Sequence, residues 1–183
     1  MEDHLRFIYS DVNSWLSFAE AKNGALLAAN AALIVSALGL VGGRVFTYRW
    51  VEYYFYSFVL LSSLSALLCL ISFLPQIEIP LIRPRLPSDR RDNLRFYGDI
   101  SDYDPPTYLT ALCSRYGFPL DSIEPFEEDL AESIVVNSRI CMRKYRLFRT
   151  AVWLNVAALV TPVFSILLCV LWKSRENRPG ITV

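Results

Sequence analysis

The stretch PFEEDLAESIVVNSRICMRKYRLFRTAVWLNVAALV, residues 125–160, decides the fold of this chain. It begins with a run of acids, becomes basic between Arg139 and Arg149, and carries no charge from Thr150 to Trp172. The uncharged part holds 23 residues, which is long enough for a helix to cross a hydrocarbon core of about 30 Å. Because neither proline nor glycine interrupts residues 126–161, we expect one helix to run from water into lipid.

Two earlier runs also lack charge and predict two more membrane helices. The first, residues 23–43, is rich in small residues that let helices approach closely in lipid. It contains Asn30, which we interpret as a bond within a packed bundle rather than as a pore-lining group, although both readings remain open. The second, residues 53–77, follows an aromatic belt that includes Trp50 and Tyr53, and Pro75 is expected to end it.

The N-terminal residues 1–22 predict an amphipathic helix. Apolar residues recur at helical spacing and form one stripe, made of Leu5, Ile8, Val12, Trp15 and Ala19. This stripe fits a helix that lies against the membrane or against the rest of the protein. Its heptad-like spacing also fits the pairing of two copies of the chain.

The polar residues 78–149 predict a small helical cytoplasmic part. Asp104 precedes two prolines and is expected to cap a short helix over residues 107–116, which Gly117 would end. Most of the cations near membrane ends lie in this middle segment. The positive-inside rule therefore places the N-terminus and residues 78–149 in the cytoplasm, and the C-terminal tail outside.

These patterns together predict an all-α membrane protein. It would have an N-terminal amphipathic helix (1–22), a transmembrane hairpin (23–77), a cytoplasmic segment (78–149), a third transmembrane helix (150–172) and a tail (173–183). The cytoplasmic segment would be continuous with the last transmembrane helix.

The sequence does not indicate an enzyme or a metal centre. The four cysteines lack CxxC spacing, so we expect buried free thiols, and His4 is the only histidine. Carboxylate pairs such as Asp102 and Asp104 fit surface positions and helix caps better than acid–base catalysis. No phosphate-binding glycine loop and no HExxH motif occurs. We therefore expect no catalytic residue, no bound metal and no cofactor, and the zero net charge gives no indication of nucleic-acid binding.

One basic face could bind phosphate. Arg139, Arg143 and Arg146 share one side of the predicted helix, with Lys144 a step around it. Guanidinium groups grip phosphate with two bonds, but the same cations also suit cytoplasmic anchoring at lipid headgroups. Phe96 and Tyr97, beside Arg95, could stack on a nucleobase or could form the core of the small domain.

The order of several motifs resembles the Pycsar transmembrane effectors, small bacterial anti-phage proteins. The matching pieces are AEAKNGALLAANAAL (19–33), IRPRLP (82–87), NLRFYGDI (93–100), PPTYLTAL (105–112) and RKYRLFRTA (143–151). The resemblance covers roughly residues 11–172. Tyr97 departs from the family pattern, in which a small residue is expected beside the aromatic one.

The resemblance implies a function that composition alone does not reach. A partner pyrimidine cyclase would make cyclic CMP or cyclic UMP during infection, and the nucleotide would activate an effector that impairs the bacterial inner membrane. The chain would act as a homo-oligomer in the bilayer, without nucleic acid. The predicted nucleotide-binding residues are Arg95, Phe96, Tyr97, Arg139, Arg143, Lys144 and Arg146.

Two alternatives remain. The first is a constitutive membrane scaffold that docks a soluble partner through residues 78–149. The second, which the absence of a metal-type motif disfavours, is a membrane enzyme that uses acids such as Asp99 or Asp102.

Overall fold

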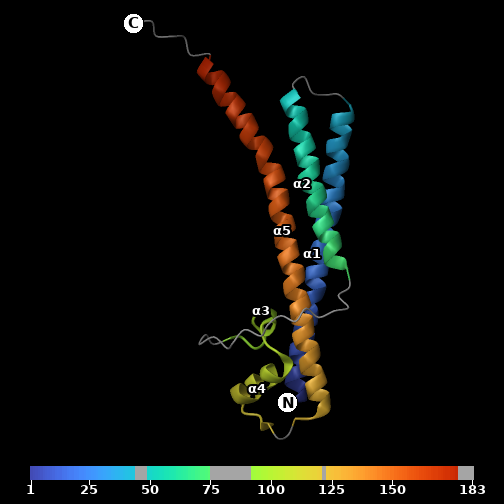
Figure 1. The fold of residues 1–183 in the computed structure, drawn as a ribbon, viewed down its shortest axis with the longest axis vertical. Coiled ribbons are helices and arrows are strands. Elements are labelled where there is room, and N and C mark those ends of the chain that lie inside the picture. Colours follow the sequence, from blue (N-terminus) through green and yellow to red (C-terminus); the bar gives the residue numbers. More distant parts are fainter. Residues whose placement is uncertain (44–48, 75–91, 121–122, 177–183) are drawn as a thin grey trace, which may run out of the picture. The chain divides into compact units, whose positions relative to one another are not determined.

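A computed structural model describes residues 1–43, 49–74, 92–120 and 123–176, with side chains described for these residues except 49–50 and 162–176. The described residues form five helices and no strand: α1 (Glu2–Gly42), α2 (Arg49–Phe73), α3 (Tyr97–Ile100), α4 (Pro105–Tyr116) and α5 (Pro125–Glu176) (Figure 1). The all-helical prediction is confirmed for this part of the chain. Predicted features within residues 75–91, and in the tail beyond residue 176, lie outside the described residues.

The chain divides into two compact units. The head unit holds Met1–Gly24 with Ser72–Phe148, and the apolar unit holds Ala25–Ile71 with Arg149–Val183. Two helices, α1 and α5, each supply residues to both units.

The sequence separated an N-terminal helix from the first membrane helix, but the structure has one helix, α1, across that boundary. Only Gly24 weakens the helix there, and one glycine costs about 1 kcal/mol, which is too little to break a helix of this length. The end at Gly42 agrees with the pair of glycines in the sequence. The helix α2 begins at Arg49 and ends at Phe73, whereas the sequence predicted residues 53–77, so both ends come four residues earlier than expected. An end before Pro75 is expected, since the residue preceding proline avoids helical geometry.

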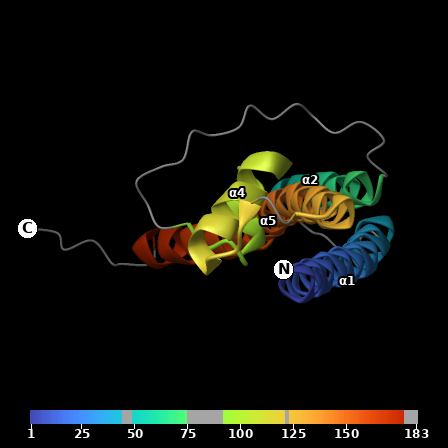
Figure 2. The ribbon, with the colours of Figure 1, turned by 90° about the horizontal axis from the view of Figure 1, so that it is seen from below.

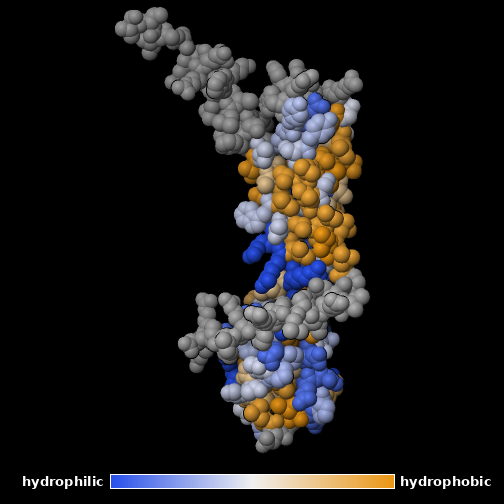
Figure 3. Space-filling view, viewed as in Figure 1, coloured by the Kyte–Doolittle hydropathy of each residue, from blue (hydrophilic) through white to orange (hydrophobic). Residues whose placement is uncertain are grey.

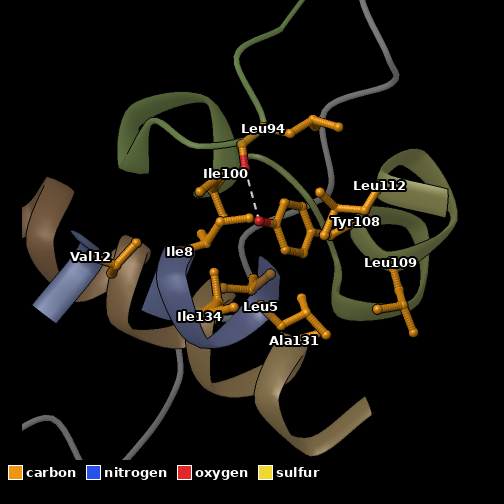
Figure 4. Packing of buried hydrophobic residues seen from close by; sticks show 11 residues of the cluster. Leu5, Ile8, Val12, Leu94, Ile100, Tyr108, Leu109, Leu112, Ala131 and Ile134 are labelled. Carbon is orange, nitrogen blue, oxygen red and sulfur yellow. Dashed lines mark hydrogen bonds between the residues drawn. The ribbon is translucent and has the colours of Figure 1, made fainter. Parts of the chain in front are cut away.

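The head unit is held by a core from three segments of the chain. Leu5, Ile8 and Val12 of α1 pack with residues of α4 and α5, including Tyr108 and Ile134 (Figure 4). The predicted apolar stripe of α1 therefore packs against the rest of the protein. Trp15, which belonged to that stripe, is 43% exposed.

The short helix α4 is capped at both ends by the predicted residues, Asp104 and Gly117. The Asp104 carboxylate accepts hydrogen bonds from the Thr107 amide at 3.2 Å and its hydroxyl at 3.0 Å, and Gly117 ends the helix with φ of 76°. In the core beside this helix, the buried Tyr108 hydroxyl donates to the Leu94 carbonyl at 2.9 Å (Figure 4). That bond ties α4 to the segment preceding α3.

We expect Asp104→Ala to lower the free energy of unfolding by about 1 kcal/mol at neutral pH, because the cap of α4 is lost. Asn also caps helices, so Asp104→Asn should be nearly neutral there. Burial raises the pKa of Asp104, but the Thr107 hydrogen bonds and the Arg139 charge outweigh it, and the net pKa is lowered. A lowered pKa contributes stability above the ordinary value of 3.8, which is lost as the pH falls through the folded pKa.

Thermal unfolding in detergent at neutral and acidic pH tests this expectation. The native chain should lose more stability on acidification than Asp104→Asn does. An equal acid loss in the two proteins would contradict the assignment of this pH dependence to Asp104.

The apolar unit is built from α1, α2 and α5, which lie side by side when viewed along their axes (Figure 2). A small cluster of Ala37, Phe58 and Ala158, one from each helix, is buried between them. The face of this unit that Figure 3 shows is largely hydrophobic where it is coloured. By length and composition, α1 and residues 51–73 of α2 could cross a membrane. The third predicted span, residues 150–172, lies in α5, but its side chains beyond Thr161 are outside the described residues.

Candidate functional site

Arg95 lies at the edge of a hollow in the head unit. Its guanidinium Nη2 is 3.2 Å from Asp11 Oδ2, and its Cζ lies 4.6 Å from the centroid of the Phe7 ring. The backbone amide of Arg95 donates to the Asn93 side chain, and the Asn93 amide donates to Asp99. Local hydrogen bonds therefore fix the backbone that carries Arg95.

The hollow has a volume of about 370 Å³ and is lined by Asp3, His4, Phe7, Ile8, Arg95 and Tyr116. We call it the Arg95 pocket. Its volume is within the usual range for small-molecule sites. The His4 ring lies 5.9 Å from the Tyr116 ring, so aromatic faces and one guanidinium border the same space. The guanidinium and the rings suit a ligand with a flat ring and a negative charge, while the Asp3 carboxylate on the same lining would repel that charge.

Phe96 and Tyr97 belong to a group of aromatic rings that begins at the start of α3. The Tyr97 ring stacks on Tyr145 of α5 at 5.3 Å with 15° between the planes, and it lies 5.8 Å from Trp15 of α1. Phe96 lies 4.5 Å from Tyr97 and is 40% exposed. Tyr97 is therefore an internal stacking partner, and Phe96 presents the more accessible ring.

Gly98, immediately after these two aromatic residues, leaves room for the Phe96 ring. A Cβ atom at Gly98 would lie 2.4 Å from the Phe96 ring. A small residue was expected at position 97, and the larger Tyr97 packs its ring against Tyr145.

Arg139 has a structural position in the head unit. Its guanidinium donates to the Tyr103 carbonyl at 2.7 Å and to the Ser101 carbonyl at 3.3 Å. These bonds fasten α5 to the turn between α3 and α4. Both donors face the protein backbone, so this side chain is less available for phosphate than the sequence suggested.

The other predicted cations on α5 have different surroundings. Lys144 is only 12% exposed and pairs with Glu20 of α1 at 2.8 Å. Arg143 is half-buried and forms no ion pair with the described residues, and Arg146 is exposed. By helical geometry, Arg143 lies about 160° around α5 from Tyr145. Arg143 and the Tyr97–Tyr145 stack therefore lie on different sides of α5.

Lys22 is a cation that the sequence reasoning did not single out. Its Nζ lies 4.2 Å from the Phe18 ring and 5.5 Å from the Tyr145 ring. Phe18 precedes Lys22 by one helical turn, which is the signal that could have indicated this contact. Lys22 is also the last charged residue before the uncharged run of α1.

Burial extends the pH range over which the nearby titratable groups stay neutral. Desolvation raises the pKa of both Tyr97 and Tyr145, and it raises the pKa of the Cys141 thiol to about 12. A neutral thiol is a poor nucleophile. The prediction of buried free cysteines is confirmed for Cys69, Cys113 and Cys141, while Cys169 lies outside the described side chains.

Comparison with known protein families then gives the family of this chain. A family model described as the Pycsar effector protein domain matches residues 4–172. The chain belongs to the Pycsar effector family. The resemblance seen in the motifs is thereby confirmed, and no curated protein and no solved structure matches the chain.

Membership in the Pycsar effector family implies an anti-phage effector that responds to a cyclic nucleotide, with the signal supplied by a partner cyclase. Together with the two helices able to span a membrane, it indicates a membrane protein. In the Arg95 pocket, one guanidinium and several aromatic rings border the same hollow.

Proposed function

We propose that the head unit binds cyclic CMP or cyclic UMP and that binding causes the apolar unit to impair the bacterial inner membrane, which stops the infected cell. The chain would act without catalysis, metal or cofactor, as a homo-oligomer. The N-terminus and residues 78–149 would face the cytoplasm, where the nucleotide is made.

The observation that carries the proposal is the Arg95 pocket. A cyclic pyrimidine nucleotide has one negative phosphate and one flat base. Arg95 can supply the fork that holds phosphate, and the aromatic rings of Phe7 and Tyr116 line the same hollow, where they could contact the base. The pair with Asp11 is exposed, so exchanging this carboxylate for phosphate costs little.

A second location within the head unit is Arg143. Arg143 is half-buried and has no ion pair among the described residues. It could bind the phosphate of a nucleotide that a neighbouring copy of the chain holds. Arg139 is less suited, because its bonds to Ser101 and Tyr103 hold the fold.

Transmission to the membrane would use the two helices shared by the units. α1 supplies Phe7 to the Arg95 pocket and also supplies the first candidate span. A nucleotide that binds more tightly to the active arrangement of the head unit would shift the population of the whole chain toward it. No enzymatic step is required for this response.

Leakage of a small dye from liposomes that contain the purified protein tests the proposal. We expect leakage on addition of cyclic CMP or cyclic UMP, and background leakage with cyclic AMP or without nucleotide. Equal leakage in all samples would contradict nucleotide control. No leakage from correctly folded protein would favour the constitutive scaffold, which predicts a soluble partner and no nucleotide dependence.

A further inference from the structure

The apolar unit contains a polar cluster at the meeting point of its three helices. Asn30 of α1, Ser65 of α2 and Asn155 of α5 are 0%, 0% and 8% exposed. The amide nitrogens of Asn30 and Asn155 donate to the Ser65 hydroxyl at 2.9 and 2.8 Å. The same hydroxyl donates to the Ala151 carbonyl at 2.9 Å. One oxygen atom therefore links all three helices.

The hydrogen-bonding capacity of Ser65 is fully used, but that of its neighbours is not. A hydroxyl can accept two hydrogen bonds and donate one, and Ser65 does all three. Both asparagines therefore direct the side-chain amide nitrogen toward Ser65, and their amide oxygens point away from the Ser65 hydroxyl. The Oδ1 atoms of Asn30 and Asn155 are buried and find no donor among the described residues. The hydroxyl of Ser62, one turn before Ser65 on α2, is buried and unpaired in the same way.

Unpaired acceptors at this depth are costly, because lipid cannot donate a hydrogen bond. All three groups are too buried for a lipid headgroup or for another copy of the chain to reach them. Water is small enough to satisfy buried polar groups of this kind. Neutral amide and hydroxyl oxygens also suit the passage of small hydrated ions, because they can replace part of a hydration shell without trapping the ion.

An apolar layer lies next to the polar cluster. Ala37, Phe58 and Ala158 come from the same three helices and form a buried contact. On each helix this residue lies one or two turns from the polar residue: Ala37 follows Asn30, Phe58 precedes Ser65 and Ala158 follows Asn155. A narrow apolar layer beside a polar one blocks ions by excluding water.

We propose that Asn30, Ser62, Ser65 and Asn155 form a hydrated polar path through the apolar unit, which the Phe58 layer closes at rest and along which small ions cross when the effector is active. The proposal rests on the proposed membrane impairment and specifies its route as a path inside each bundle. General damage to the surrounding lipid would not require these residues.

Cysteine accessibility tests the path directly. In a chain whose four native cysteines are replaced by alanine, we would compare Asn155→Cys with Val156→Cys in liposomes. Val156 is the next residue on α5 and is 39% exposed, so it faces away from the cluster. A charged, membrane-impermeant thiosulfonate reagent is added with and without cyclic CMP or cyclic UMP, and potassium flux and the modified fraction are measured.

With the activating nucleotide, position 155 should react about tenfold faster than without it, as expected for a site exposed only on opening. It should also react faster than position 156, and potassium flux should fall as modification proceeds. Equal rates at the two positions, or modification of 155 without a change in flux, would overturn the path.

A third variant separates failure of the path from failure of nucleotide control. If the native chain shows no flux with any nucleotide, the proposed function is wrong, and the path is judged in Phe58→Ala without nucleotide. Removing the apolar layer should then make Asn155→Cys react faster than it does with Phe58 retained, while Val156→Cys is unchanged. No difference between these two backgrounds would overturn the path on its own.

Discussion

Replacing Ser65 with alanine should destabilise the apolar unit by about 2 kcal/mol, because three interhelical hydrogen bonds of roughly 0.6 kcal/mol each are lost. The Ser65 hydroxyl accepts hydrogen bonds from Asn30 and Asn155 and donates one to Ala151. Replacing Ser65 with alanine removes all three. The Asn30 amide would then lack an acceptor as well as a donor, whereas the Asn155 amide would keep its 3.4 Å hydrogen bond to the Ala151 carbonyl. If these bonds exist only in the closed arrangement, 2 kcal/mol corresponds to a roughly thirtyfold rise in the open population.

The measurements are thermal unfolding of the protein in lipid nanodiscs and potassium flux from liposomes without nucleotide. Ser63→Ala is the matched control, since Ser63 is two residues away on α2 and exposed. Ser65→Thr keeps a hydroxyl and should retain most of the stability. If Ser65→Ala and Ser63→Ala unfold at the same temperature and show the same basal flux, the cluster does not hold the bundle closed.

Hydrophobic periodicity was sufficient to predict that α1, α2 and α5 are helical, because burial and membrane insertion both follow from local patterns, but the short helix α3 was not predicted. The uncharged run of α2 and the caps of α4 could be read from nearby residues, including Asp104 and Gly117. The continuity of α1 was missed, because the sequence change at Lys22 marks a change of environment without marking a break in the helix. The distribution of charged residues indicates which segments lie in water and which in lipid, but it does not indicate where a helix ends.

The candidate site was less predictable, because side-chain partners depend on contacts between distant segments. The sequence placed Arg95 among the ligand-binding residues, but its proximity to Phe7 depends on packing between α1 and the loop before α3. Helical spacing grouped Arg139 with Arg143, although the first donates to backbone carbonyls and the second does not pair with described residues. Asn30 was recognised as unusual, but its partners on α2 could not be identified from spacing alone.

Replacing Arg95 with alanine should weaken binding of the activating cyclic nucleotide by about ten- to a hundredfold. A hydrogen bond to a charged group contributes roughly 1.5–3 kcal/mol, and 1.4 kcal/mol is a tenfold change in affinity. Arg95→Lys keeps the charge but loses the planar fork, so it should fall between the native chain and Arg95→Ala. Binding is measured by calorimetry on the detergent-solubilised protein, with dye leakage as the second measurement.

Arg6→Ala is a closely matched control. Arg6 also lies in the head unit, pairs with one acid, Glu2, and lies 5.0 Å from one aromatic ring, that of Phe126. It does not line the Arg95 pocket. Both arginines are largely exposed, so neither substitution should change the unfolding temperature much. A loss of affinity confined to Arg95→Ala would therefore assign the phosphate to this pocket rather than to general surface charge.

Native affinity in Arg95→Ala would contradict that assignment and direct attention to α5. In that case Arg143→Ala combined with Lys144→Ala should abolish binding, because Arg143 has no ion pair with the described residues and Lys144 can exchange Glu20 for phosphate. If binding and leakage survived that double substitution as well, neither basic group would hold the nucleotide. The two sets of variants thus distinguish a pocket made by α1 and the loop before α3 from a basic surface on α5, because each predicts loss of affinity in a different protein.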